Sequence, residues 1–243
     1  MGTRSALCAS LVGLVLISSA RANMLANAQL DKANATPLDQ FGLLTLSKTV
    51  NSAALTGWTI SSGTVDIVPS AYWQTSNESA SYSVDLVGSP GIGAISQAVA
   101  TTAATDYTFT FDLAANPEAG PQMETGTTKI LRVEALAADG TTVLASTDFQ
   151  ITKGARTLQN MQWQSNSFTF TATGATSTIL LSAITPLNLP EGATSSNIFT
   201  GPVIDNLNLF PSGSPPTPTP EPASLGLLGV SASALLLKRR RGR

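Results

Sequence analysis

The feature that most restricts the fold is a strict alternation of apolar and polar side chains in short stretches. In residues 107–113 (YTFTFDL) the odd positions are apolar and the even positions are polar, and residues 168–173 (FTFTAT) repeat this pattern. Successive side chains of a β-strand point to opposite faces, so the pattern predicts two strands with one buried face each. For the first strand, the side chains expected in a core are Tyr107, Phe109, Phe111 and Leu113.

Similar runs continue along most of the chain. Residues 129–136 and 142–151 are two alternating runs joined through Ala138-Asp139-Gly140, a typical hairpin signal. Further strands are expected at 58–60, 65–68, 81–87, 94–99, 178–183 and 203–209. Eight or more short strands separated by Gly, Pro, Asn and Asp predict an all-β protein with a single β-sandwich or jelly roll. No internal boundary interrupts residues 23–210, so we expect one domain there.

The composition excludes several kinds of chemistry. The 243 residues include no histidine, and the one cysteine is Cys8. Histidine-based acid–base catalysis, Ser-His-Asp triads, ordinary zinc sites and disulfides are therefore not expected, and no cofactor is predicted. Between residues 23 and 219, six basic residues face 14 acidic ones, a net charge of −8. Such a domain would repel phosphate backbones, so we expect no nucleic-acid partner.

The N-terminus has the three parts of a secretory signal. Arg4 supplies a positive charge, residues 6–17 are apolar, and Ala20-Arg21-Ala22 is a small-x-small cleavage site. We expect residues 1–22 to be a signal peptide recognised by the Sec translocon and cut after Ala22, which would remove Cys8. The alternative is a buried N-terminal helix.

The C-terminus combines a proline-rich linker (211–219) with residues 220–243, which begin with Pro220-Glu221-Pro222. An apolar run at 223–237 and a basic tail at 238–243 (Lys238, Arg239, Arg240, Arg241) follow. A helix of these 15 apolar residues would reach roughly 22 Å, less than the hydrocarbon core of about 30 Å. By the positive-inside rule the basic tail would stay cytoplasmic. A plain single span is the alternative.

These three parts, in this order, closely resemble the bacterial PEP-CTERM sorting signal. The resemblance covers about the last two dozen residues. It implies an exosortase partner, processing near the Pro-Glu-Pro motif, and a transient inner-membrane anchor. It also implies final delivery to the cell surface or extracellular matrix of a Gram-negative bacterium.

The strands carry a second resemblance. The stretches GWTISSGTVDIV, YTFTFDLAANP, ILRVEAL and GPVIDNLNL look like the choice-of-anchor C family over most of residues 50–210. That resemblance implies a β-sandwich similar to galactose-binding-type domains and to plant cell-wall proteins whose domain has no assigned function. The opening segment, residues 23–28 (NMLANA), lacks the Phe and Glu of the family pattern.

Large aromatics with polar atoms are the candidate ligand contacts. Exposed rings of this kind can stack on sugars. Tyr72 and Trp73 lie in a stretch rich in Ser and Asn and form the best candidate patch, whereas Trp58 and Trp163 are more typical of a sandwich core.

The carboxylates give weaker candidates. Asp205 shares the parity of Val203, Leu207 and Leu209, so alternation points it inward. Hydrogen bonds inside the protein are the expected partners, with calcium as a weaker alternative. Asp66, Asp85, Asp112, Glu124 and Glu134 could in principle supply the carboxylate pair of a glycosidase, but no spacing singles out an acid and a nucleophile.

The sequence thus favours a secreted, non-enzymatic surface or matrix protein that binds polysaccharide. Two alternatives remain open. One is a structural matrix or adhesion protein without a ligand site, and the other is a carbohydrate-active hydrolase.

Overall fold

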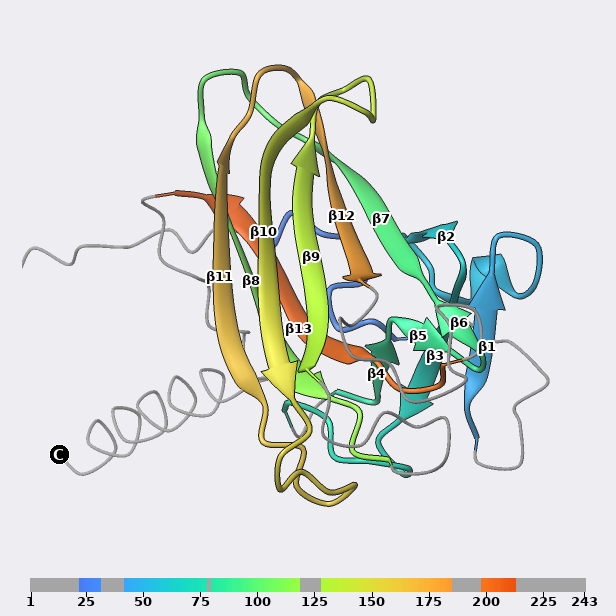
Figure 1. The fold of residues 1–243 in the computed structure, drawn as a ribbon. Coiled ribbons are helices and arrows are strands. Elements are labelled where there is room, and N and C mark those ends of the chain that lie inside the picture. The colour runs from blue at the N-terminus through green and yellow to red at the C-terminus, as the bar shows by residue number, and fades with distance from the viewer. Residues whose placement is uncertain (1–21, 32–41, 78–79, 119–127, 185–197, 213–243) are drawn as a thin grey trace, which may run out of the picture. The chain divides into compact units, whose positions relative to one another are not determined.

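The protein folds into two facing antiparallel β-sheets (Figure 1), as a computed structural model describes it over residues 22–31, 42–77, 80–118, 128–184 and 198–212. One sheet has six strands in the order β1-β3-β4-β13-β8-β11, and the other has five in the order β10-β9-β12-β7-β2. The all-β sandwich predicted from the alternation is confirmed.

The strands of the six-stranded sheet come from both halves of the chain. They are β1 (Leu44–Ser47), β3 (Thr64–Pro69), β4 (Tyr82–Asp85), β8 (Asp106–Ala115), β11 (Gln164–Thr171) and β13 (Pro202–Pro211). The five-stranded sheet contains β2 (Thr59–Ser62), β7 (Ala94–Ala100), β9 (Thr128–Leu136), β10 (Val143–Thr152) and β12 (Thr176–Ile184). A two-stranded ribbon, β5 (Val87–Gly88) with β6 (Gly91–Ile92), and one turn of 3-10 helix, η1 (Ser52–Ala54), complete the described elements.

The main core lies between the two sheets, and the alternating stretch 107–113 contributes to it as predicted. Tyr107, Phe109, Phe111 and Leu113 are each no more than 3% exposed. The predicted hairpin is also confirmed: β9 pairs with β10, and Asp139 Oδ1 accepts hydrogen bonds from the backbone N–H groups of the next turn residues. Every predicted strand overlaps an observed one, while β1, β6 and η1 are additional.

Strand β13 contains a β-bulge that corrects one prediction. The pairing of β13 with β8 shifts register between Asp205 and Asn208, and Asn206 takes a left-handed φ of 52°. One extra residue reverses the alternation beyond the bulge. Leu207 and Leu209 therefore belong to the main core, whereas Asp205 lies on the outer face of the six-stranded sheet. Asp205 is fully buried, as expected, but on the opposite side of the sheet.

The start of the domain is tied to its last strand. Asn23 Oδ1 accepts a hydrogen bond of 3.0 Å from Leu209 N, and Met24 N donates to Leu209 O at 3.0 Å. The predicted domain end at residue 210 falls just short of the end of β13 at Pro211.

The two targeting segments remain predictions. The signal up to Ala20, the sorting motif at Pro220, the helix at 223–237 and the basic cluster lie outside the described residues. Within the ranges given above, no helix is long and apolar enough to cross a membrane.

Candidate functional site

A second, smaller hydrophobic cluster lies on the outer face of the six-stranded sheet. Val68, Ala114 and Val203 alternate with residues of the main core and so point away from it. Trp73 and Met161 cover them, and these five buried residues form what we call the satellite cluster. Its cover comes from two loops, 70–77 between β3 and β4 and 153–163 between β10 and β11.

Gln74 joins these two loops through three hydrogen bonds. Its backbone N–H donates to Leu158 O at 2.8 Å, and its side-chain oxygen accepts from Met161 N at 3.1 Å. Its carbonyl accepts from the indole Nε1 of Trp163 at 3.0 Å. Hydrogen bonds from both the backbone and the side chain of Gln74 therefore connect the two loops and fix their relative position.

Arg156 closes the longer loop on itself. Its guanidinium donates to Thr152 O at 2.5 Å and to Gln162 O at 3.1 Å, so it connects the two ends of the loop. The side chain is buried, and burial lowers the pKa of its guanidinium from the ordinary value. This arginine has a structural role and is not available to a ligand.

Trp73 does not form the exposed patch predicted from the sequence. It is 3% exposed, and its indole N–H donates to the buried Ser83 Oγ at 2.7 Å. Trp73 is thus a core residue of the satellite cluster, and its ring is not free to stack on a sugar. The prediction of an exposed Tyr72–Trp73 pair is wrong for Trp73.

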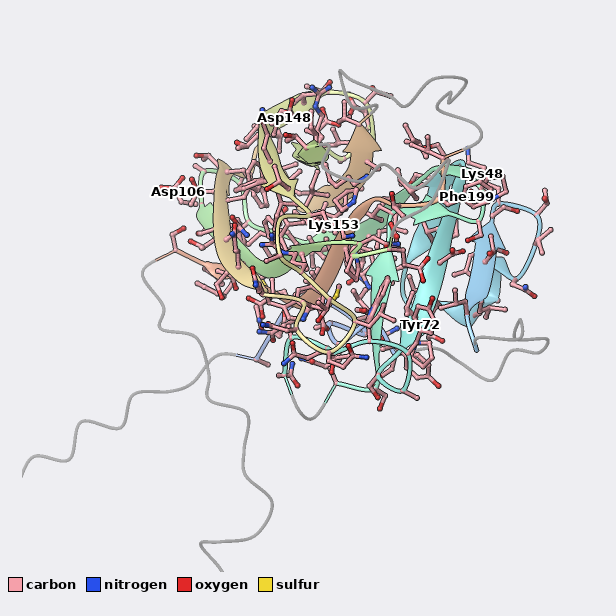
Figure 2. All side chains as sticks on the ribbon, turned by 60° about the horizontal axis from the view of Figure 1, so that its bottom comes forward. Lys48, Tyr72, Asp106, Asp148, Lys153 and Phe199 are labelled. Carbon is pink, nitrogen blue, oxygen red and sulfur yellow. The ribbon has the colours of Figure 1, made fainter. Side chains whose placement is uncertain are left out.

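The aromatic residues that reach the surface near the satellite cluster are Tyr72 and Trp163. Both are half-buried and pack against the satellite cluster from outside. The rings of Tyr72 and Trp73 have centroids 5.8 Å apart, and the Tyr72 hydroxyl hydrogen-bonds to the Glu118 carboxylate. We call Tyr72 and Trp163 the aromatic surface. Figure 2 views this end of the domain, with Tyr72 labelled.

Four carboxylates line the outer face of the same sheet, and two of them are strongly perturbed. Asp66 is the cross-strand partner of Asp85, and Asp112 is that of Asp205. Burial raises the pKa of Asp85 to about 8, although Asn116 Nδ2 at 2.7 Å and Val87 N at 2.9 Å donate to it. Burial likewise raises the pKa of Asp205 to about 6.

These carboxylates are buried and accept hydrogen bonds from groups of the protein. Asp205 accepts bonds from Ser76 N at 2.8 Å and Asn206 N at 2.7 Å, which are the structural partners expected for it. Asp66, Asp85 and Asp112 are at most 8% exposed. In the described part of the chain, no three acidic side chains gather to hold a metal ion.

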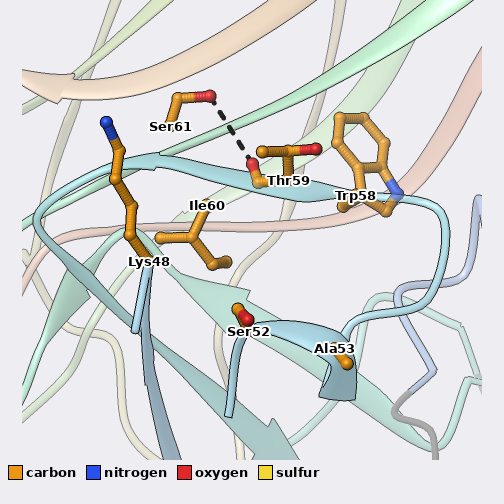
Figure 3. Close-up of a pocket in the computed structure, with 7 residues that line it drawn as sticks. All are labelled: Lys48, Ser52, Ala53, Trp58, Thr59, Ile60 and Ser61. Carbon is orange, nitrogen blue, oxygen red and sulfur yellow. Dashed lines mark hydrogen bonds between the residues drawn. The ribbon is translucent and has the colours of Figure 1, made fainter. Parts of the chain in front are cut away.

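Trp58 is buried as expected for a sandwich core. It is 5% exposed, and its indole N–H donates to Asn27 O at 3.2 Å. One edge of it nevertheless lines a surface pocket together with Lys48, which sequence reasoning did not identify (Figure 3).

A family model of proteins of unknown function, DUF642, matches residues 24–209. The chain belongs to the DUF642 family. The match spans the sandwich and begins one residue after the expected start of the domain. A search of curated proteins finds no match.

Three solved structures illustrate what the domain is similar to. An arabinose-bound α-L-arabinofuranosidase is 15% identical with a TM-score of 0.50, over 80% of this chain and 27% of that one. A family 4 carbohydrate-binding module is 13% identical, with a TM-score of 0.42 over 77% of this chain and 99% of that one. A family 35 module from Clostridium thermocellum is 15% identical, with a TM-score of 0.37 over 70% and 92%. The chain thus spans about a quarter of the arabinofuranosidase, and that similarity shows the fold alone.

Proposed function

We propose that this DUF642 protein is a non-catalytic polysaccharide-binding protein, and that Tyr72 and Trp163 form its contact surface. The observation that carries the proposal is that two half-buried aromatic rings rest on one buried hydrophobic cluster. Aromatic rings provide flat apolar area that complements the C–H face of a sugar, and their polar atoms bind the hydroxyls around it. A fold shared with part of an arabinose-bound α-L-arabinofuranosidase supports a carbohydrate as the class of ligand.

The two rings are fixed in place before any ligand arrives. Trp163 is held through its indole N–H by the Gln74 carbonyl, and Tyr72 through its hydroxyl by Glu118. A side chain that is already ordered loses little conformational entropy when a ligand binds. Exposed polar groups such as the Gln74 side chain lie next to these rings and can donate to sugar hydroxyls.

We propose a non-catalytic role because the two carboxyl groups with raised pKa values are buried and cannot contact a substrate. Asp85 and Asp205 are at most 1% exposed and already accept hydrogen bonds from the protein. A glycosidase needs two carboxyl groups that flank a bound glycosidic bond. Asp85 and Asp205 instead have a structural role, because each is buried and accepts hydrogen bonds from the protein.

The proposal includes export and sorting. A signal peptide over residues 1–22 would direct the chain to the Sec translocon, and exosortase would process it near Pro220-Glu221-Pro222. The apolar run 223–237 would hold it transiently in the inner membrane before release to the surface or matrix of a Gram-negative bacterium. Intact mass of the cell-associated protein tests this, and a steady-state species that still carries Arg243 would contradict it.

Polysaccharide pull-down with the full chain tests the binding function. We expect Trp163→Ala to weaken binding five- to thirty-fold, which corresponds to about 1–2 kcal/mol for loss of one aromatic contact. Val143→Ala is the matched control, because Val143 is 51% exposed and lies on β10, away from the aromatic surface. Absence of binding to every polysaccharide of the producing cells would favour a purely structural matrix protein. Hydrolysis that one carboxylate substitution abolishes would favour an enzyme.

A further inference from the structure

A pocket of about 390 Å³ lies beside β2, the edge strand of the five-stranded sheet (Figure 3). Its Lys48 lies apart from Tyr72 in Figure 2. The volume of the pocket is in the lower range of small-molecule sites. The turn after β1, the helix η1 and strand β2 form it. The lining residues are Lys48, Ser52, Ala53, Trp58, Thr59, Ile60 and Ser61.

The turn that carries Lys48 is ordered by its own hydrogen bonds. Ser47 N donates to Val50 O at 2.9 Å, and the Ser47 hydroxyl accepts from Val50 N at 3.1 Å. Next to it, Asn51 adopts a left-handed φ of 53° and starts η1. The lysine is therefore presented from a closed turn.

The opposite wall of the pocket is fixed by Gln97. This side chain is 6% exposed and donates to Gly57 O at 2.8 Å and to Ala26 O at 2.9 Å. Its oxygen accepts from Ala26 N at 2.7 Å. These bonds fix the Gly57 turn, where φ is 84°, and with it the indole of Trp58.

The polar groups of the pocket leave binding capacity for a ligand. Within the described ranges, Lys48 Nζ has no ion-pair or hydrogen-bond partner, and neither has the Ser52 hydroxyl. Ser61 Oγ donates to Ser96 Oγ at 2.6 Å and can still accept a hydrogen bond. The indole N–H of Trp58 is taken by Asn27 O, so the ring contributes an apolar edge.

Among the described basic residues of this acidic domain, Lys48 and Lys153 have side-chain nitrogens without a partner in the described ranges, and of these two Lys48 lines the pocket. Arg132 pairs with Asp148 at 2.7 Å, Arg156 bonds to loop carbonyls, and Lys129 is buried with its Nζ 2.9 Å from Thr200 Oγ1. Lys48 is exposed in a pocket. An ammonium group next to hydroxyls and an aromatic edge suits a ligand that is both anionic and hydroxylated.

We propose that this pocket binds a carboxylated sugar residue, with the carboxylate on Lys48 Nζ and the ring against Trp58 and Ile60. One lysine balances the single charge of a carboxylate, whereas a phosphate monoester carries up to two charges. This proposal adds a second site and a class of ligand to the proposed polysaccharide binding. It rests on the proposed function only in one respect, namely that the carboxylate belongs to a sugar. It does not require the aromatic surface.

The test compares an oligogalacturonate with the same oligosaccharide after reduction of its carboxyl groups. Binding to the full chain, purified in non-ionic detergent, is measured by calorimetry. We expect the acidic form to bind three- to ten-fold more tightly, because an exposed ion pair contributes modestly, and the preference to shrink in about 1 M salt. Lys48→Met should abolish the preference for the acidic form, whereas Lys48→Arg should retain it.

Indole N–H resonances locate the ligand. The acidic oligosaccharide should shift the Trp58 resonance, assigned through Trp58→Phe, and Trp163→Ala should leave this shift intact. Equal binding of both oligosaccharides, or an unchanged preference in Lys48→Met, would overturn the carboxylate site. Loss of neutral-glycan binding in Trp163→Ala would still support the aromatic surface, so the two proposals can fail separately. A sulfated oligosaccharide that binds more tightly than the carboxylated one would also overturn the assignment.

Discussion

Replacement of Trp73 by alanine tests whether this residue belongs to the core or to a ligand site. Truncation of a buried tryptophan costs about 3–5 kcal/mol through lost burial and the cavity that remains. The buried Ser83 hydroxyl would also lose the indole N–H, 2.7 Å away, which adds about 1 kcal/mol. Because loops 70–77 and 153–163 cover the cavity, they can partly collapse into it, so we expect a total near 4 kcal/mol.

That loss is a large part of a typical domain stability of about 5–15 kcal/mol. Urea unfolding followed by far-ultraviolet circular dichroism measures it without depending on tryptophan fluorescence. Trp163→Ala is the matched comparison, since Trp163 is half-buried and should cost about 1–2 kcal/mol while it weakens glycan binding. A Trp73→Ala variant that keeps its unfolding midpoint and loses binding would refute the core assignment.

Three further measurements test the packing. Burial raises the pKa of Asp85 to about 8, so the protonated carboxyl group stabilises the folded state. This contribution to the free energy of unfolding is complete below pH 4 and is lost as the pH rises to 8, by at most about 1.4 kcal/mol per pH unit. Asp85→Asn should flatten this pH dependence in urea unfolding at pH 4, 6 and 8. Gly201→Ala would place a Cβ 2.5 Å from Asp85 Oδ1 and should lower the free energy of unfolding by about 1–3 kcal/mol, whereas Gly174→Ala, with nothing within 4 Å, should change it by less than about 0.5 kcal/mol. Arg132→Gln removes a pair with Asp148 in which both side chains are about 40% exposed, so a thermal melt should show a loss below about 1 kcal/mol, and a larger loss would contradict the exposed geometry.

The strands could be predicted because alternation is a local property of the sequence. The stretch 107–113 defines its buried face without reference to any other residue, and all four expected core side chains are buried. Asp205 shows the limit of the same rule. Parity with Leu207 and Leu209 predicted that Asp205 is buried between the sheets, but the extra residue at Asn206 breaks that parity, and Asp205 is buried on the other face; no composition signal marks that bulge.

The sequence does contain an indication that Trp73 is buried, although it is not an alternating pattern. Strand β3 contains Val65, Ile67 and Val68, so apolar side chains point to both of its faces. A strand with two apolar faces is covered on both sides, and the cover here includes Trp73. By contrast, Trp163 lies 90 residues further along the chain, and only the tertiary fold brings its loop to Gln74.

The two candidate ligand sites follow from how this sandwich covers its surfaces. Two loops that Gln74 connects by hydrogen bonds cover the outer face of the six-stranded sheet. Tyr72 and Trp163 pack against the outside of the satellite cluster that these loops bury. Both rings are half-buried there, with one side packed against the cluster. Near β2, an edge strand, a turn and η1 form a pocket that both Lys48 and Trp58 line. The same fold therefore offers an aromatic contact and a pocket with a lysine, and the ligand that we propose for the two together is a polysaccharide with occasional carboxylated residues.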